Sequence, residues 1–330
     1  MSGSPVHLTL AISDYDHVRD LAEGGVRPEG IELTVLTLQV EEIFYRFTRY
    51  QEWDVSELSL AKYASLVSQG ESPFVGIPVF PSRVFRHSAL YVRSDSGLHD
   101  PRQLAGRRVG VPEWAQTAGI YVRGFLEHEF GVRPRDVDWY QSGVNEAGRV
   151  EKVDLRLPEG VRLTRVADRS LDEMLLAGDL DAVASARPPR SFLAGEGVVR
   201  LFPDSRAAEE ASLRATGVFP IMHLVAIRRP IVERHPWVPG ELLKAFDEAR
   251  RRSVERLEDM VASRVPAPWA ANHAASMREL FGGDPWRYGI EPSRVTLDAF
   301  LGYAYEQGCC HRSLRAEDLF PETVRSTFKV

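Results

Sequence analysis

The sequence predicts an α/β protein of two lobes, each built on a doubly wound, mostly parallel sheet with a hinge and a cleft between them. Three observations support this prediction. The chain has 330 residues, which suggests two domains at roughly 150 residues each. The segments up to Phe80 alternate strand-like with helix-like patterns, a rhythm typical of parallel sheets. An apolar run at 218–227 returns late in the chain, before a mainly helical C-terminal part.

The first part of the chain contains four strand-like segments. Residues 6–12 alternate apolar and polar side chains, as a half-buried strand does. Ser13 precedes Asp16 at capping-box spacing, so a helix is expected to follow and to stop at Gly24-Gly25. Further strands are expected at 31–38, 53–58 and 74–80, and further helices at 41–50 and from a Ser59 cap to 68.

A second set of elements begins near His87. Strands are expected at 89–92, 107–111 and 182–184, and helices at 100–104, 116–130, 170–177, 241–263, 270–280 and 294–307. We expect residues 1–82 and 222–330 to form one discontinuous lobe, which includes the C-terminal helices, and 83–221 to form the inserted lobe. Two chain crossings, near 81–88 and 217–223, would then make a hinge beside a ligand cleft.

The composition is that of an ordinary globular protein, with 44% hydrophobic and 27% charged residues. The net charge is −6, so no basic surplus indicates nucleic-acid binding. No apolar run reaches the ~18 residues of a membrane helix, and residues 1–14 lack a secretory pattern. We therefore expect a cytoplasmic protein that binds neither nucleic acid nor membranes. Cys309 and Cys310 are sequence neighbours, which argues against a structural disulfide.

Two segments resemble motifs of type II periplasmic-binding-protein folds. In residues 99–112 a short helix leads into a strand, and residues 170–184 form a helix, a Gly-acidic turn and a strand. These motifs imply the fold and say almost nothing about activity.

Other stretches carry a more specific resemblance. They are Val26 to Ile31, Glu41-Glu42-Ile43-Phe44, Phe80 to Ser88, Gly148-Arg149-Val150-Glu151-Lys152 and Phe219-Pro220-Ile221-Met222-His223. Together they resemble the 4,5-dihydroxyphthalate decarboxylase family over nearly the whole chain. The resemblance implies an enzyme that removes one carboxylate from a dihydroxylated aromatic diacid to give protocatechuate. Two alternatives stay open: a non-catalytic binding protein for an anionic aromatic solute, and a decarboxylase acting on another aromatic acid.

Arg83, Arg86 and His87 lie at the first expected crossing. Two guanidiniums and an imidazole at a hinge make a suitable anion clamp, because arginine binds a carboxylate with paired hydrogen bonds and stays charged. The alternative is that these side chains pair with surface acids. We favour the clamp, with His87 as a general acid.

Three further arginines lie in candidate ligand loops. Arg187 and Arg190 flank two prolines after the strand 182–184, where doubly wound folds place ligands; a solvated turn is an equal alternative. Arg149 follows the glycine-rich stretch 142–148, which would let backbone N–H groups approach an anion. The alternative there is a plain flexible loop.

His223 lies in the apolar run at the second crossing, where it could approach His87 and donate a proton. The alternative is a hydrogen-bonded core histidine. Glu57 could act as a general acid if it is buried.

Three weaker candidates lie at the starts of helices. Ser59 could hold a carboxylate at a helix N-terminus or act as a simple cap. Arg19 lies at the first strand–helix junction, which we expect to border the cleft, and could add a positive charge there; Thr117, near the start of the helix at 116, is the corresponding candidate in the second lobe.

No cofactor is predicted. A hydroxyl para to the departing carboxylate supplies electrons to the ring, so the reaction implied by the resemblance needs no organic cofactor. No histidine or cysteine spacing indicates a metal site, although His87, His223 and Glu57 would be compatible with one if the fold assembled them. The expected partner is a small aromatic carboxylate, and the long C-terminal helices could supply a dimer face.

Overall fold

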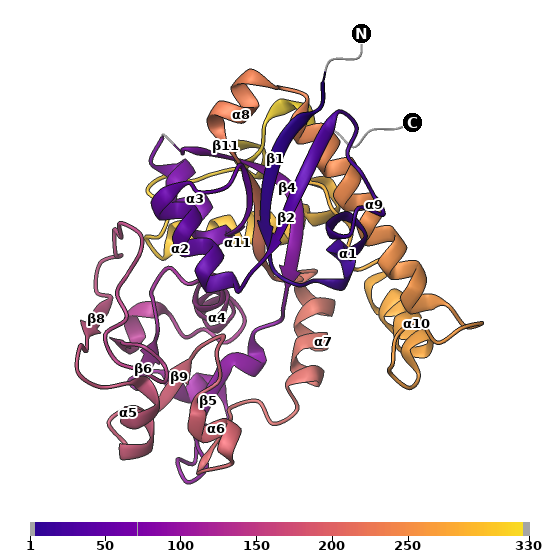
Figure 1. The fold of residues 1–330 in the computed structure, drawn as a ribbon. Helices are drawn as coiled ribbons and strands as arrows, with labels where there is room; N and C mark the ends of the chain where they lie inside the picture. The colour runs from indigo at the N-terminus through magenta and orange to yellow at the C-terminus, as the bar shows by residue number, and fades with distance from the viewer. Residues whose placement is uncertain (1–3, 71, 326–330) are drawn as a thin grey trace.

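The computed structural model describes residues 4–70 and 72–325 and contains two mixed sheets with helices around them (Figure 1). The five-stranded sheet has the order β2-β1-β3-β11-β4 and the six-stranded sheet the order β10-β5-β9-β6-β7-β8. The strands of the first are β1 (Val6–Ile12), β2 (Ile31–Thr37), β3 (Val55–Ser59), β4 (Phe74–Arg83) and β11 (Ile221–Arg228). Those of the second are β5 (Leu90–Arg93), β6 (Arg108–Val111), β7 (Asp138–Gln141), β8 (Arg162–Arg165), β9 (Ala182–Ala184) and β10 (Val198–Arg200).

Each sheet contains one strand that runs against the others. β11 pairs antiparallel with both β3 and β4, and β5 pairs antiparallel with both β9 and β10. These are the first strands that the chain forms after it passes from one sheet to the other. The remaining strands of each sheet share one direction, so the predicted α/β fold with mostly parallel sheets is confirmed.

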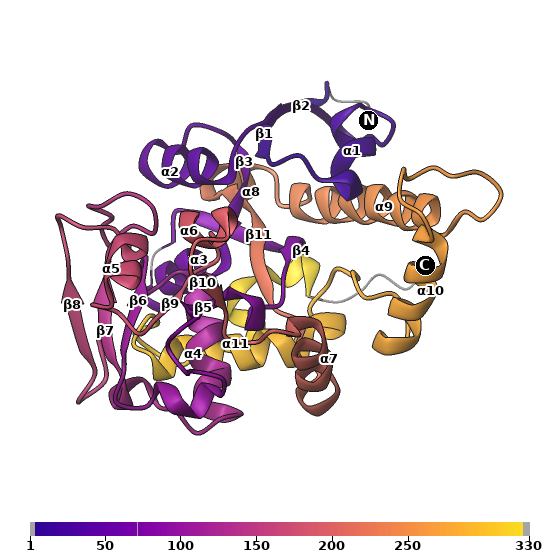
Figure 2. The same ribbon diagram turned by 90° about the horizontal axis from the view of Figure 1, so that it is seen from below.

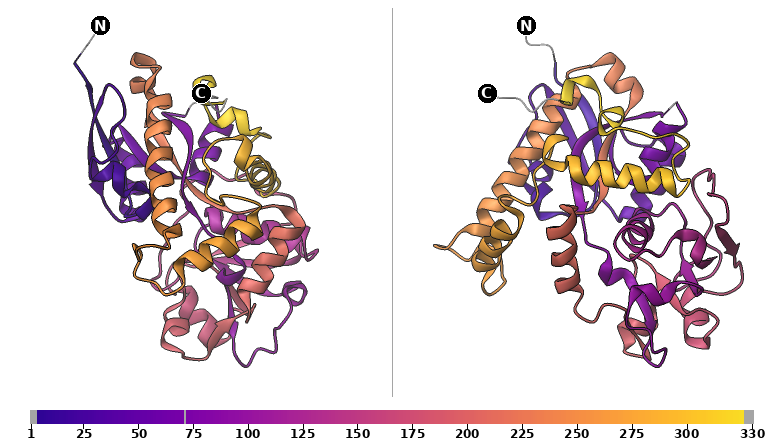
Figure 3. Two further views of the ribbon diagram at one scale, coloured as in Figure 1. Left: turned by 90° about the vertical axis from the view of Figure 1, so that its right-hand side faces the viewer. Right: turned by 180° about the vertical axis from the view of Figure 1, so that it is seen from behind.

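Helices cover both sheets. They are α1 (Asp16–Ala22), α2 (Val40–Tyr50), α3 (Leu60–Ser68), α4 (Thr117–His128), α5 (Leu171–Ala177), α6 (Arg190–Ala194), α7 (Ser205–Thr216), α8 (Arg229–Arg234), α9 (Val238–Glu258), α10 (Ala270–Phe281) and α11 (Arg294–Glu306). The long helix α9 packs against α1, and α10 projects from its far end (Figure 3). No helix in the described part of the chain has the length and apolar character needed to span a membrane.

Helix α11 lies beside α4 of the six-stranded half (Figure 2). Gly124 allows this approach, because a Cβ atom there would lie 2.3 Å from the ring of Tyr303. One C-terminal helix therefore packs against the half that the sequence assigns to the inserted lobe.

The structure differs from the expected elements mainly in the short and polar ones. Strand β4 runs on to Arg83 past Pro81; it lies at the edge of its sheet, where a missing N–H donor is tolerated. The elements β7, β8, β10, α6, α7 and α8 have no counterpart among the expected ones. Edge strand β8 shows why: its four residues, RLTR, are polar and mostly exposed, so they carry no buried-strand pattern. Cys309 and Cys310 are buried free thiols, as expected.

Candidate active site

A buried carboxylate and a partly exposed imidazole form a pair on the five-stranded sheet. Nδ1 of His223 lies 2.6 Å from Oε1 of Glu57. The Glu57 side chain is fully buried, whereas that of His223 is 17% exposed. The imidazole Nε2 has no hydrogen-bond partner among the described residues. A carboxylate on Nδ1 fixes the ring orientation and leaves Nε2 to exchange a proton.

The sheet register brings these two residues together. In the antiparallel pair β3–β11, His223 lies opposite Ser59, and Glu57 lies opposite Val225. His223 and Glu57 are therefore diagonal neighbours, within reach of each other's side chains. A bulge in the pairing of β11 with β4 falls at His223, and bulges commonly re-aim a side chain beside a functional site.

Two more groups hold the Glu57 carboxylate in place. The Tyr15 hydroxyl donates to Oε1 at 2.7 Å, and the backbone N–H of Ser13 donates to Oε2 at 3.0 Å. Burial, together with the charge of Glu57, raises the pKa of Tyr15, which therefore stays protonated and keeps donating. The ring of Phe44 packs edge-on against the imidazole, with centroids 4.8 Å apart. The imidazole is thus fixed from two sides.

The two halves of the molecule meet beside this pair, at what we call the junction. It comprises the contacts of Glu41, Ser59 and Lys62 from the five-stranded half with Thr117, Arg149, Lys152 and Arg187 from the six-stranded half. Ser59 Oγ lies 3.0 Å from Thr117 Oγ1, which also accepts from the N–H of Ala61 at 3.2 Å. Ser59 caps α3 and Thr117 begins α4. Two helix N-termini, which favour anions, therefore face each other.

Arginine side chains complete the junction. One oxygen of Glu41, at the start of α2, lies 3.2 Å from Arg187 and 3.5 Å from Arg149. Arg149 is also held by Glu113, with its Nε 2.5 Å from the carboxylate. Lys62 donates to the backbone carbonyl of Lys152, and burial lowers the pKa of this lysine. Two guanidiniums from the six-stranded half thus meet one carboxylate from the five-stranded half.

Two curated proteins are similar to this chain over most of its length. A 4,5-dihydroxyphthalate decarboxylase from Comamonas testosteroni is 38% identical over 329 residues, covering 99% of this chain and all of the relative. The chain belongs to the 4,5-dihydroxyphthalate decarboxylase family. A second member of the family, from Pseudomonas putida, is 39% identical over 212 residues, which is 64% of this chain and 82% of the relative. No family model matches the chain.

Solved structures confirm the predicted binding-protein fold of this dihydroxyphthalate decarboxylase family member. The periplasmic aliphatic sulphonate binding protein SsuA from Escherichia coli matches with a TM-score of 0.56, covering 100% of this chain and 96% of that protein at 14% identity. A periplasmic sulfonate-binding protein from Methylobacillus flagellatus matches with a TM-score of 0.57, covering 97% and 92% at 12% identity. At these identities the likeness concerns the fold alone.

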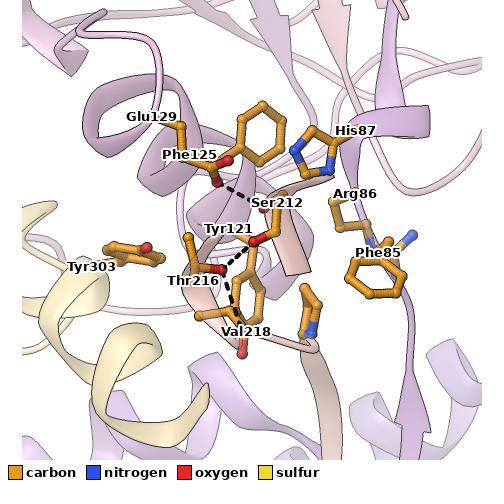
Figure 4. Close-up of a pocket in the computed structure, with 11 residues that line it drawn as sticks. Phe85, Arg86, His87, Tyr121, Phe125, Glu129, Ser212, Thr216, Val218 and Tyr303 are labelled. Atoms are coloured by element: carbon orange, nitrogen blue, oxygen red, sulfur yellow. Dashed lines mark hydrogen bonds between the residues drawn. The ribbon is translucent and has the colours of Figure 1, made fainter. Parts of the chain in front are cut away.

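Among the described residues, Arg83, Arg86 and His87 at the first crossing make no hydrogen bond, ion pair or ring contact with His223 or Glu57. Neither ring nitrogen of His87 has a hydrogen-bond partner in the described part of the chain, and the ring stacks on Phe125 with centroids 4.2 Å apart (Figure 4). Burial lowers the pKa of His87 to about 4. Arg86 lines the same cavity and donates to the sulfur of Met222 at 3.1 Å. This cavity of about 20 Å³ has room for one water molecule and none for an aromatic diacid.

The Arg83 side chain is buried and forms hydrogen bonds within the protein. Its guanidinium donates to Ser293 Oγ at 2.7 Å and to the backbone carbonyls of Arg287 and Phe219. Burial lowers its pKa to about 10, still well above neutral. These bonds tie strand β4 to the C-terminal region, so the side chain is already engaged.

Two other predicted arginines lie apart from the junction contacts. Arg19 is exposed and pairs with Asp16 on its own helix, at 3.0 Å. The Arg190 side chain is exposed, and its guanidinium has no hydrogen bond or ion pair with any described residue; only its backbone N–H is bonded, to Asn145. Of the predicted arginines, the structure brings only Arg149 and Arg187 together.

The predicted histidines and glutamate do not form a metal cluster. In the described part of the chain, the group of three acidic or histidine side chains close enough to hold an ion is Glu127, His128 and Glu306. It lies at the C-terminal end of α4, roughly 16 Å along the helix from Thr117.

Glu41 and Phe44 are not among the site residues that the sequence predicts. Both lie in the stretch Glu41-Glu42-Ile43-Phe44, whose only indication is the family resemblance. Their spacing of three places them on one face of a helix, and this was the signal available. It could not show that the face is directed toward His223 and the arginines.

Proposed function

We propose that this chain decarboxylates 4,5-dihydroxyphthalate to protocatechuate at the junction, with His223 as the proton donor. The observation that carries the proposal is the His223–Glu57 pair, in which a buried carboxylate holds a partly exposed imidazole. Family membership supports the reaction class, since both similar curated proteins are named for this decarboxylation. We also propose that residues 1–82 with 222–330, and residues 83–221, move as two bodies around the substrate. The cytoplasmic location stays a prediction.

The arginines would bind and orient the substrate. The carboxylate that is retained would take the position between Arg149 and Arg187, where paired guanidinium bonds fix the plane of the ring. Glu41 and Phe44 lie one helical turn apart, and Phe44 contacts the imidazole of His223. A ring anchored at the arginines would therefore extend toward Nε2 of His223.

Proton transfer to the ring would start the chemistry. The His223 imidazolium, stabilised by the Glu57 carboxylate, donates its Nε2 proton to the carbon that bears the departing carboxylate. The resulting cation is stabilised by the hydroxyl para to that carbon. The carbon–carboxylate bond then breaks, its electron pair restores the aromatic ring, and CO₂ leaves. Neutral His223 regains a proton from water, so each turnover consumes one proton.

The departing carboxylate loses its charge during the reaction, so a strong clamp on it would oppose catalysis. The Phe44 ring beside the imidazole offers an apolar wall for this group. The retained carboxylate keeps its charge throughout, which suits the arginines.

The test is to incubate the purified protein with 4,5-dihydroxyphthalate while following CO₂ and protocatechuate. We expect turnover that His223→Ala lowers by about 10²- to 10⁴-fold, the usual contribution of a general acid. His273→Ala, which changes an exposed histidine on α10, is the matched control. Tight binding without turnover by the unaltered protein would instead indicate a binding protein. Turnover that persists in His223→Ala would show that His223 is not the proton donor.

A further inference from the structure

Glu41 occupies the position that we assign to a substrate carboxylate. Its Oε1 atom lies 3.2 Å from Arg187 and 3.5 Å from Arg149. Glu41 belongs to α2 of the five-stranded half, whereas Arg149 follows β7 and Arg187 follows β9 of the six-stranded half. A carboxylate supplied by the protein itself thus lies between the two guanidiniums.

The surroundings of Glu41 make it easy to displace. Its side chain is 52% exposed and that of Arg187 is 63% exposed, and ion pairs with this much exposure contribute little free energy. Arg149 would stay in place without Glu41, because its Nε is bonded to Glu113, whose side chain is only 9% exposed. The Arg149 guanidinium would therefore stay in the same place when the Glu41 carboxylate moves away from it.

We propose that Glu41 is a stand-in carboxylate, which neutralises Arg149 and Arg187 in the empty protein and is displaced by the retained carboxylate of the aromatic acid. This inference rests on the proposed function for the place of that carboxylate. One carboxylate exchanges for another, so the guanidiniums are never left unpaired. A ligand without a carboxylate could not displace Glu41, and the position therefore selects aromatic carboxylates over neutral phenols.

The opposite role would be a latch, in which the same ion pairs hold the two halves together around the ligand. The two roles predict opposite effects of removing the charge. A stand-in competes with the ligand, so its loss tightens binding. A latch supports the closed arrangement, so its loss weakens binding.

The experiment is calorimetric titration of phthalate into the full chain and into two variants, Glu41→Gln and Glu42→Gln. Phthalate has both carboxylates but lacks the hydroxyls, so it binds without being consumed. Glu42 is the matched control because it is next to Glu41 in the same helical turn, carries the same charge, and pairs with Arg46 on its own helix. We expect the Kd of Glu41→Gln to fall about two- to fivefold, the range of exposed ion pairs, and the Kd of Glu42→Gln to stay unchanged.

Several results would overturn the inference. These are an unchanged or higher Kd in Glu41→Gln, an equal gain in Glu42→Gln, or no binding of phthalate to any of the three proteins. A further arm adds Arg187→Met to Glu41→Gln, and the gain must then disappear, because these residues form one coupled pair.

Binding and turnover are separate readouts, so the two proposals fail separately. Tighter phthalate binding by Glu41→Gln, together with no turnover of 4,5-dihydroxyphthalate by the unaltered protein, would sink the proposed reaction and leave the stand-in role intact. Turnover by the unaltered protein without tighter phthalate binding by Glu41→Gln would support the proposed reaction and overturn the stand-in role of Glu41.

Discussion

His223 on β11 and Glu57 on β3 are diagonal neighbours across an antiparallel strand pair, and their side chains meet at 2.6 Å. The carboxylate is inaccessible to water and accepts from three donors: the imidazole, the Tyr15 hydroxyl and the N–H of Ser13. A buried charge is tolerated only when it is bonded in this way. The cost of burying Glu57 is thus offset by bonds that also hold the imidazole in one orientation.

The first prediction concerns the charge of Glu57. Glu57→Gln keeps the size and the hydrogen-bonding capacity of the side chain but removes the negative charge that stabilises the His223 imidazolium. We expect kcat for 4,5-dihydroxyphthalate to fall roughly 100-fold, with KM changed much less, because Glu57 is not placed against the substrate. Steady-state kinetics at several pH values measures both constants.

Tyr15→Phe is the control for this prediction. It removes one of the three donors to Glu57 and leaves the charge in place, so its loss of kcat should be clearly smaller. An equal loss of kcat in both variants would show that the hydrogen bonds that position the Glu57 side chain matter and that its charge does not.

The second prediction concerns the hydroxyl of Thr117, which links the two halves. Thr117→Val keeps the shape of the side chain but leaves the buried N–H of Ala61 without its acceptor and Ser59 without its partner across the junction. We expect the free energy of unfolding to fall by about 1–3 kcal/mol, the cost of an unsatisfied buried donor. Thr117→Ser restores the hydroxyl and should recover most of the loss in denaturant unfolding. If both variants unfold alike, the hydroxyl bonds contribute nothing.

The third prediction concerns the pH dependence of stability. Burial lowers the pKa of His87 from 6.5 to about 4 in the folded protein. Below pH 6.5 the unfolded chain therefore binds a proton that the folded chain refuses, so stability falls as the pH drops toward 4. The shift corresponds to about 3 kcal/mol in all.

His87→Phe should remove this dependence. A phenyl ring can keep the stack on Phe125 and does not titrate, so the loss of stability between pH 6.5 and 4 should become smaller. Part of the slope should remain, because burial also lowers the pKa of His17 to about 4. Urea unfolding of both proteins at several pH values measures how the free energy of unfolding changes with pH. Turnover of 4,5-dihydroxyphthalate should persist in His87→Phe. If the free energy of unfolding depends on pH equally in both proteins, His87 has the same pKa in the folded and unfolded states and the prediction is wrong.

Of the residues that the sequence singled out, Glu57 and His223 form a pair in the structure, whereas Arg83, Arg86 and His87 do not form an anion clamp. His223 interrupts an apolar run, so the sequence alone makes it conspicuous. Glu57 lies in the polar strand VSELS, which only the structure shows to be buried, and a charged group in a buried strand requires a partner. That they partner each other follows from the insertion of β11 between β3 and β4, a long-range pairing that no local pattern encodes.

The clamp at the first crossing shows the opposite case. Arg83 and His87 have the residue types of a clamp, but their roles depend on what packs around them. The C-terminal region supplies Ser293 and the carbonyl of Arg287 to Arg83, and Phe125 covers His87. These contacts join residues far apart in the sequence, so local spacing could not separate an engaged arginine from a free one.

The last prediction separates two arginines that the sequence treats alike. Arg187 and Arg190 flank the same two prolines, but of these two residues Arg187 alone forms an ion pair with a carboxylate among the described residues. We expect Arg187→Ala to raise the KM for 4,5-dihydroxyphthalate about five- to tenfold, because a charge-assisted bond to the retained carboxylate is lost. The kcat should change little, since this carboxylate keeps its charge in the transition state.

Arg190→Ala removes the same charge from the same loop and should leave both constants near those of the unaltered protein. The comparison therefore controls for the general attraction of a dianion to a positive surface. That general attraction would raise KM equally in both variants and would weaken with added salt. A specific contact raises it in Arg187→Ala alone, and an equal rise would mean that the retained carboxylate binds elsewhere.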